Sequence, residues 1–185
     1  MLVSVFVGIS VDGFLARQNG ALDFLDEGGG EPHGYDEFIK TVDAHVIGRN
    51  TYEVVLGFGG WAYGKKRVVV LSSKPLDLSV VQEGNVEQMS GEPKDIVARL
   101  AESGAKHLYV DGGITVQRFL RAGLVDKLTV TRVPVLIGEG IPLFGSLPAD
   151  IRLSHIATTS YKGGLVKSEY SLKAAASPAT ERSQS

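Results

Sequence analysis

The sequence predicts a three-layer α/β domain with a mainly parallel central sheet, helices on both faces and a C-terminal antiparallel hairpin. Short apolar runs rich in β-branched residues alternate with stretches of helical period, which favours parallel strands joined by crossover helices. Two of the runs end in a glycine turn that leads directly into a helical stretch, at Gly48 and at Gly112-Gly113. Near the end of the chain, two further runs flank Lys162-Gly163-Gly164, and this pattern predicts the hairpin.

Five apolar runs are typical of buried strands because they are short and rich in valine and isoleucine. They are residues 2–9, 45–47, 67–71, 107–110 and 128–137. Helices are predicted at residues 35–41, 93–103 and 114–122. In the last two, the apolar residues fall on one stripe and a glycine follows the end. The hairpin strands are predicted at residues 152–161 and 165–172.

The length of the chain, 185 residues with 43% hydrophobic content, predicts one domain with a full core. We expect this domain to span residues 1–173. Residues 174–185 lack any apolar period and are predicted to be a disordered tail. The acidic, glycine-rich residues 23–34 resemble a mobile loop beside a site more than a linker.

Composition excludes several functional classes. The formal net charge of -2 offers no strong field for nucleic acid or an anionic membrane, so neither is an expected partner. The absence of cysteine excludes disulfides and thiolate nucleophiles. The four histidines show no metal-ligand spacing, so no metal site is expected. No long apolar span or signal-peptide pattern occurs, and a cytoplasmic location is therefore the expectation.

The turn Gly48-Arg49-Asn50-Thr51 is the first candidate binding site. A strand that ends in a helix start leaves unpaired backbone N–H groups, and these can bind a phosphate. The Arg49 guanidinium could pair with a second anionic oxygen. An ordinary helix start with a solvated arginine explains the same residues, and the sequence leaves both interpretations open.

The turn at Gly112-Gly113 is the second candidate. Paired glycines allow a positive φ and a close approach of the backbone to a ligand, and Thr115 adds a hydroxyl at the helix start. The G-x-G-x-x-G spacing of the Rossmann fingerprint is missing. A third strand end carries Ser72, Ser73 and Lys74, whose hydroxyls and ammonium suit a ribose phosphate. Each of these segments can also be a turn without a ligand.

Two carboxylates on the predicted helix 35–41 are candidates for the substrate site. Asp36 or Glu37, beside the acidic loop, could hydrogen-bond the amidine-like edge of a pteridine or pyrimidine. A solvated helix face explains either residue equally well.

Four strings resemble the dihydrofolate reductase-like superfamily. They are SVDGFLA from Ser10, DAHVIGRNTYE from Asp43, VDGGITVQRFLRAGLVDKLTVTRVPVLIGEGIPLFG from Val110, and the closing hairpin. The resemblance runs from about Leu2 to Leu172. It is greatest to stand-alone bacterial proteins related to the reductase domain of the riboflavin-biosynthesis deaminase-reductase.

The resemblance implies an NADPH site and assigns residues to it. The residues that it places against the phosphates and the adenosine side are Gly48, Arg49, Asn50, Thr51, Ser72, Ser73, Lys74, Gly112, Gly113, Ile114, Thr115 and Val116. Those that it places around the nicotinamide are Gly8, Ile9 and Ala16. The glycine pair resembles one that carries a cis peptide in these reductases. The resemblance also implies a homodimer.

The activity implied is NADPH-dependent reduction of a small heterocycle, with 5-amino-6-(5-phosphoribosylamino)uracil as the candidate substrate and Asp36 as the polar anchor. Dihydrofolate or pterin reduction is the alternative, although the proline-tryptophan loop of dihydrofolate reductases is absent from residues 17–25. A non-catalytic nucleotide-binding protein is the alternative of another class.

Overall fold

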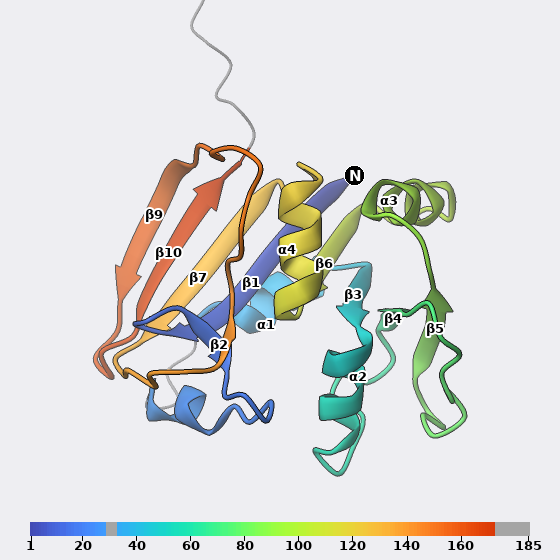
Figure 1. Ribbon diagram of the computed structural model, residues 1–185, viewed down its shortest axis with the longest axis horizontal. Coiled ribbons are helices and arrows are strands. Elements are labelled where there is room, and N and C mark those ends of the chain that lie inside the picture. Colours follow the sequence, from blue (N-terminus) through green and yellow to red (C-terminus); the bar gives the residue numbers. More distant parts are fainter. Residues whose placement is uncertain (29–32, 173–185) are drawn as a thin grey trace, which may run out of the picture.

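The structure, a computed structural model, describes residues 1–28 and 33–172 of the chain. Its main sheet has eight strands, whose spatial order is β5-β4-β3-β6-β1-β7-β10-β9 (Figure 1). These strands are β1 (Leu2–Ser10), β3 (Ala44–Gly48), β4 (Arg67–Leu71), β5 (Asn85–Met89), β6 (His107–Asp111), β7 (Lys127–Val133), β9 (Ser154–Ser160) and β10 (Val166–Ser171). A separate pair joins β2 (Phe14–Ala16) to β8 (Ile141–Pro142).

The six strands from β5 to β7 are parallel, and β10 and β9 complete the sheet in antiparallel pairing. The predicted fold class and the predicted hairpin are thereby confirmed. The helices are η1 (Asp23–Gly28, a 3-10 helix), α1 (Tyr35–Lys40), α2 (Arg49–Leu56), α3 (Pro93–Glu102) and α4 (Gly113–Arg121). None of the helices in the described part of the chain is long and apolar enough to cross a bilayer.

The sheet separates two packed layers. We name the side that carries α3 and α4 the front face, because these helices lie before the sheet in Figure 1, and the side that carries α1 the back face. Alternation along β1 sends Val5 and Val7 to the front, where they share a core with Val116 and Phe119 of α4. The intervening Phe6 points to the back and packs with α1.

The structure extends or corrects several sequence-based boundaries. The strand predicted at 128–137 ends at Val133, because the chain turns at Pro134 and the Val135 N–H bonds to the Val133 carbonyl at 2.7 Å. Strands β2, β5 and β8 were not predicted, since β2 and β8 have two or three residues and β5 carries a polar edge sequence. No cis peptide occurs among the described residues, so the Gly112-Gly113 bond is trans, unlike the expectation.

The segment expected to be a mobile loop is partly helical. Its first residues, 23–28, form η1, and Phe24 on this helix is buried with 2% of its surface exposed. It packs with Val133 and Leu165 on the back face of the sheet. Residues 29–32 of the expected loop, and the tail predicted at 174–185, lie outside the described residues.

Candidate active site

The two glycine turns lie side by side at the carboxyl edge of the sheet, where the parallel strands end. Strands β3 and β6 are parallel neighbours, and Ile47 pairs with Asp111 at their carboxyl ends. The chain leaves β3 at Gly48 and enters α2, and it leaves β6 at Gly112 and enters α4. The sequence predicted two separate turns, and the topology brings them together.

Each turn requires glycine because a threonine from the other helix occupies the adjacent space. A Cβ atom placed on Gly48 would lie 2.8 Å from the hydroxyl oxygen of Thr115. A Cβ atom on Gly112 would lie even closer to the Thr51 hydroxyl oxygen, and Gly112 also has a φ of +91°. The first turns of α2 and α4 therefore interlock through reciprocal threonine-to-glycine contacts.

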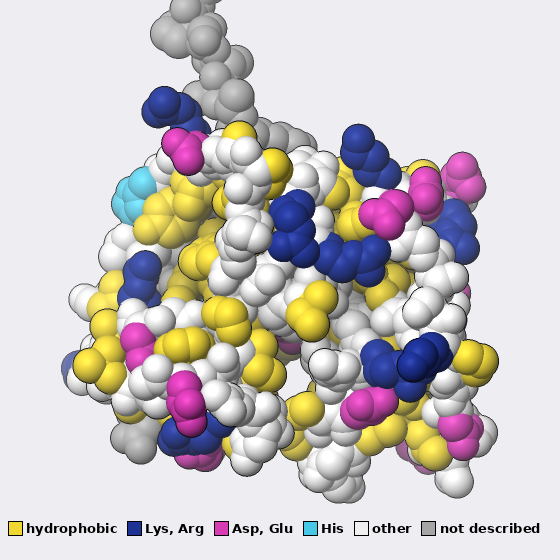
Figure 2. Space-filling view, in the orientation of Figure 1, with side chains coloured by type: hydrophobic (Ala, Val, Ile, Leu, Met, Phe, Trp, Pro, Cys, Tyr) yellow, Lys and Arg dark blue, Asp and Glu magenta, His cyan; other side chains and the backbone are white. Residues whose placement is uncertain are grey.

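Neither helix start has a side-chain cap. The first N–H groups of α2 and of α4 receive no capping hydrogen bond from a side chain, and both helix dipoles direct their positive ends to this edge. Figure 2 shows the surface hollowed below the start of α4, between the β2 segment and α2. Two adjacent uncapped helix starts fit a ligand with linked anionic groups, such as a pyrophosphate.

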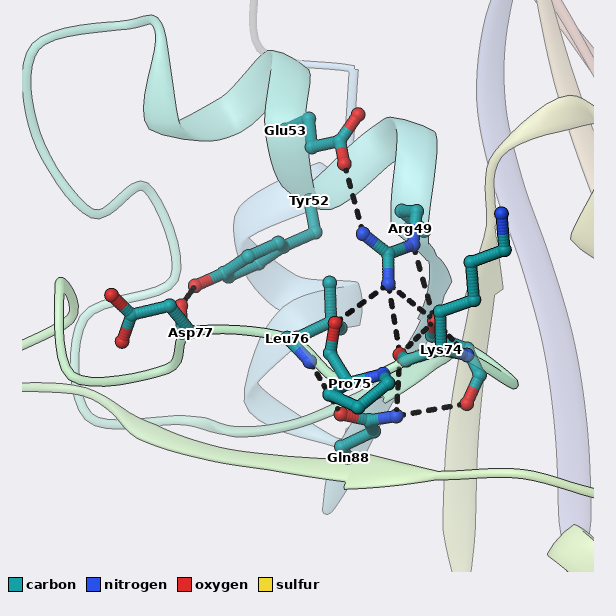
Figure 3. A network of polar contacts seen from close by, with 9 residues as sticks. Arg49, Tyr52, Glu53, Lys74, Pro75, Leu76, Asp77 and Gln88 are labelled. Atoms are coloured by element: carbon teal, nitrogen blue, oxygen red, sulfur yellow. Dashed lines mark hydrogen bonds and ion pairs between the residues drawn. The ribbon is translucent and has the colours of Figure 1, made fainter.

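Arg49 holds the segment that follows β4 (Figure 3). Its guanidinium donates to the Ser72 hydroxyl at 2.9 Å and to the carbonyl oxygens of Lys74 and Pro75 at 2.8 and 2.9 Å. Glu53, one turn along α2, lies 3.4 Å away. Arg49 thus positions the predicted adenosine-side residues, and its own contact with a phosphate stays a prediction. The Lys74 ammonium points away from this network.

The remaining residues that were predicted to contact the cofactor lie in different environments. Ile114 is 64% exposed at the start of α4, whereas the Val116 side chain is fully buried in the front core. Gly8 faces the back of the sheet, where the Leu25 side chain lies against it, and Ile9 is buried on the front face. Ala16 is buried on β2. The structure therefore does not gather Gly8, Ile9 and Ala16 on one surface.

Asp111 is a carboxylate that the sequence argument missed. It ends β6 on the back face, directly before the second glycine turn, and accepts a hydrogen bond from the Gly112 N–H at 2.7 Å. Burial raises the pKa of this carboxyl above its usual value. The sequence contained a signal for this residue, because Asp111 is the acidic residue that ends the predicted strand in the string LYVDGG. Alternation along that strand places it on the same face as Tyr109.

Three tyrosines lie near enough to this carboxyl for its charge to raise their pKa values. Burial and then the charge of Asp111 raise the pKa of Tyr35 to about 12, and the same two causes raise the pKa of Tyr63. Tyr109 packs edge-on against Tyr35, and its hydroxyl donates to the Phe6 carbonyl at 2.7 Å. The Asp111 carboxyl thus lies on the back face within range of three phenol groups, and burial there favours its protonated form.

The two carboxylates predicted for the substrate site, Asp36 and Glu37, are both exposed in the first turn of α1. The residues of α1 that face the sheet are Tyr35, Phe38 and Ile39. The role predicted for Asp36 stays a prediction. No group of three histidine, aspartate or glutamate residues in the described ranges is arranged to hold a metal ion.

His45 lies beneath the site on the same face. Its side chain is 1% exposed between the rings of Tyr63 and Tyr109, and neither ring nitrogen has a hydrogen-bond partner among the described residues. Burial, with a smaller contribution from the Lys66 charge, lowers the pKa of His45 to about 4. The imidazole is therefore neutral at physiological pH.

Comparison with known proteins places these features in a family context. Residues 2–167 match the family model of the RibD C-terminal domain. Over 152 residues the chain is 32% identical to YwjB, an uncharacterised protein of Bacillus subtilis (strain 168), covering 80% of this chain and 86% of YwjB.

Two solved structures show the same fold. A candidate riboflavin biosynthesis protein from Shewanella sp. PV-4 is 35% identical, with a TM-score of 0.85 and coverage of 92% of this chain and 98% of that chain. Dihydrofolate reductase from Enterococcus faecalis, complexed with NADP(H), is 16% identical, with a TM-score of 0.63 and coverage of 92% and 95%. At this low identity the second likeness concerns the fold alone.

Proposed function

Because this chain belongs to the RibD C-terminal domain family, we propose that it is an NADPH-dependent reductase of a small heterocyclic compound. The observation that carries the proposal is the interlocking of the two uncapped helix starts through Thr51 and Thr115. This edge of the sheet offers backbone N–H groups from two helices to one ligand, and a dinucleotide carries the linked phosphates that suit it.

Different residues along the carboxyl edge of the sheet would bind different parts of the cofactor. The N–H groups of α2 and α4 would hold the pyrophosphate, and the exposed Ser73 and Lys74 would face the phosphate on the adenosine ribose. Arg49 keeps that segment in place through its bonds to Ser72, Lys74 and Pro75. When bound, NADPH would supply a hydride to a C=N or sugar carbon of the substrate.

Asp111 is the residue proposed to supply the proton. Its carboxyl lies at the junction of the cofactor edge and the back face, and burial favours its protonated form. Oδ1 accepts from the Gly112 N–H, and this bond fixes the carboxyl against the turn. A protonated carboxyl held in this way can donate to the atom that gains negative charge during reduction.

The substrate class proposed is a ribosylated aminopyrimidine, such as 5-amino-6-(5-phosphoribosylamino)uracil. It is supported by the family match and by the likeness to the Shewanella protein. The test is a steady-state assay of NADPH absorbance against ribosylated aminopyrimidines, dihydrofolate and pterins. Turnover confined to the aminopyrimidines supports the proposal. If NADPH binds but none of these compounds is reduced, the result favours a non-catalytic nucleotide-binding protein.

A further inference from the structure

A second polar cluster lies on the back face, on the far side of β1 from Asp111. Strand β10 carries Lys167 and Glu169 on this face, where Lys167 pairs with Thr131 of β7. Thr131 in turn pairs with Gly8 of β1. With strands spaced about 4.8 Å apart, the cluster lies roughly 14 Å from the β6 strand that carries Asp111. This separation suits the two ends of one small substrate.

The charges in this cluster are already paired. The Lys167 ammonium lies 3.1 Å from a Glu169 carboxylate oxygen, and the two side chains are 14% and 36% exposed. Burial works against the charged form of Lys167, but the hydrogen bonds and charge interactions with Glu169 and, to a smaller extent, with Tyr161 outweigh it and raise the pKa of the ammonium. The pair therefore presents one donor and one acceptor with no net charge.

Thr131 adds an unsatisfied group to the pair. It is 4% exposed, and its hydroxyl has no hydrogen-bond partner among the described residues. A buried hydroxyl without a partner costs free energy, and a polar group bound beside Thr131 would remove that cost. Gly34, at the start of α1, lies over the cluster, since a Cβ atom there would be 3.3 Å from the Lys167 ammonium.

We propose that Lys167, Glu169 and Thr131 bind the non-reacting end of the substrate and select a neutral, hydroxyl-bearing group over a phosphate. An ammonium, a carboxylate and a hydroxyl complement sugar hydroxyls, each of which both donates and accepts hydrogen bonds. A phosphate dianion would meet the Glu169 carboxylate, which already neutralises the only ammonium of the cluster. The inference rests on the proposed function. Within the class of ribosylated aminopyrimidines it favours a nucleoside-like compound without a 5′-phosphate over 5-amino-6-(5-phosphoribosylamino)uracil, the example given above.

Titration of the ¹⁵N-labelled full chain with uridine and with uridine 5′-monophosphate tests this selection. Both are stable compounds that differ by the phosphate alone. We expect uridine to shift the amide signals of Thr131, Lys167 and Glu169, and to bind about tenfold more tightly than its monophosphate. Glu169→Gln should reduce this ratio to about threefold or less because it removes the repelling charge. Glu102→Gln, an exposed change on α3, should leave the ratio unchanged.

Tighter binding of the monophosphate, shifts that miss the three residues, or no binding of either compound would overturn the inference. Uridine and its monophosphate are compared on the wild-type chain. The test therefore remains decisive even if the Glu169→Gln protein does not fold. The NADPH assay distinguishes the two proposals. If the protein turns over a 5′-phosphorylated substrate in preference to its nucleoside, the proposed selection against phosphate is wrong and the proposed reductase activity still holds. If uridine binds but none of the tested compounds is reduced, only the proposed reductase activity is contradicted.

Discussion

The hydroxyl oxygen of Thr51 lies in the space that a Cβ atom on Gly112 would occupy. Thr115 stands in the same relation to Gly48, so the starts of α2 and α4 fix each other's position. Because the protein's own packing favours glycine at both turns, the two helix starts proposed to bind the cofactor phosphates are preorganised before any ligand arrives.

Gly112→Ala should therefore destabilise the fold more than a glycine replacement that meets no neighbour. At Gly104, φ is +93° and no atom lies within 4 Å of the added Cβ, so Gly104→Ala reports the backbone strain alone. We expect a loss of about 1 kcal/mol for Gly104→Ala and about 3 kcal/mol for Gly112→Ala. Denaturant unfolding measures both.

A double-mutant cycle isolates the contact with Thr51. In a Thr51→Ala background, Gly112→Ala should cost less than it does in the wild-type protein, because the obstructing hydroxyl is gone and only the backbone strain at Gly112 remains. An equal cost of Gly112→Ala in both backgrounds would show that the packing between the two turns does not require this glycine.

Arg49→Ala should loosen the segment that follows β4. The guanidinium satisfies two carbonyls and a hydroxyl there, and a lysine ammonium cannot reproduce this fork. We expect each of Arg49→Ala and Arg49→Lys to lower the free energy of unfolding by about 1 kcal/mol. Hydrogen exchange should localise the loss to residues 72–76, and restoration of wild-type protection by lysine would contradict the account.

Lys74→Ala separates phosphate recognition from folding. The Lys74 ammonium points away from the Arg49 network, while its backbone carbonyl makes the structural bonds. Removing the side chain should weaken NADPH binding roughly tenfold and leave NADH binding and stability unchanged. Calorimetric titration with the two cofactors measures the ratio, and equal losses for both would rule out a 2′-phosphate contact.

Asp111→Asn should abolish reduction while raising stability at neutral pH. Burial raises the pKa of the Asp111 carboxyl in the folded protein above its ordinary value of 3.8. The stabilisation that this carboxyl contributes is therefore full below pH 3.8 and is lost as the pH rises through the pKa of the folded state. Asparagine keeps the shape and carries no charge. The measurements are NADPH oxidation and unfolding between pH 4 and 8. Asp36→Asn, on exposed α1, is the control, and a loss of activity confined to that variant would transfer the role to Asp36.

His45 should make the fold sensitive to acid. Its pKa falls from 6.5 in the unfolded chain to about 4 in the folded protein, so its contribution is present above pH 6.5 and is lost as the pH falls toward 4. The shift corresponds to about 3 kcal/mol. His45→Leu should remove this part of the acid sensitivity and retain stability at pH 7, since the imidazole makes no hydrogen bond with a described residue. Parallel pH-stability curves for both proteins would contradict this.

The sequence predicted most of the fold because its signals are local. The strand at 67–71 and the helices beginning at Pro93 and near Ile114 follow directly from apolar period and from glycine and proline boundaries. Strand β5, NVEQM, lacked such a signal because it lies at the sheet edge, where polar side chains meet solvent. Among the described residues, β5 pairs with β4 alone, and that pairing is a property of the assembled sheet.

The site was predicted less completely, for a related reason. Glycine turns are visible in the sequence, so Gly48 and Gly112 could be found, but their contact depends on β3 lying beside β6. Asp111 and Lys167 belong to different strands whose positions on one face emerge only from the register. Asp36 drew attention through its acidic neighbourhood, although the inward residue of its helix is Tyr35.

The most direct test of the central claim is an NMR titration of the ¹⁵N-labelled chain with NADPH. If the two turns form one cofactor groove, the amide signals of Asn50 and Thr51 and those of Gly113 to Thr115 should move together, with one dissociation constant. Gly112→Ala should raise the NADPH dissociation constant obtained from both sets of signals by the same factor. Shifts confined to one turn, two different dissociation constants, or no shifts at saturating NADPH would contradict the account.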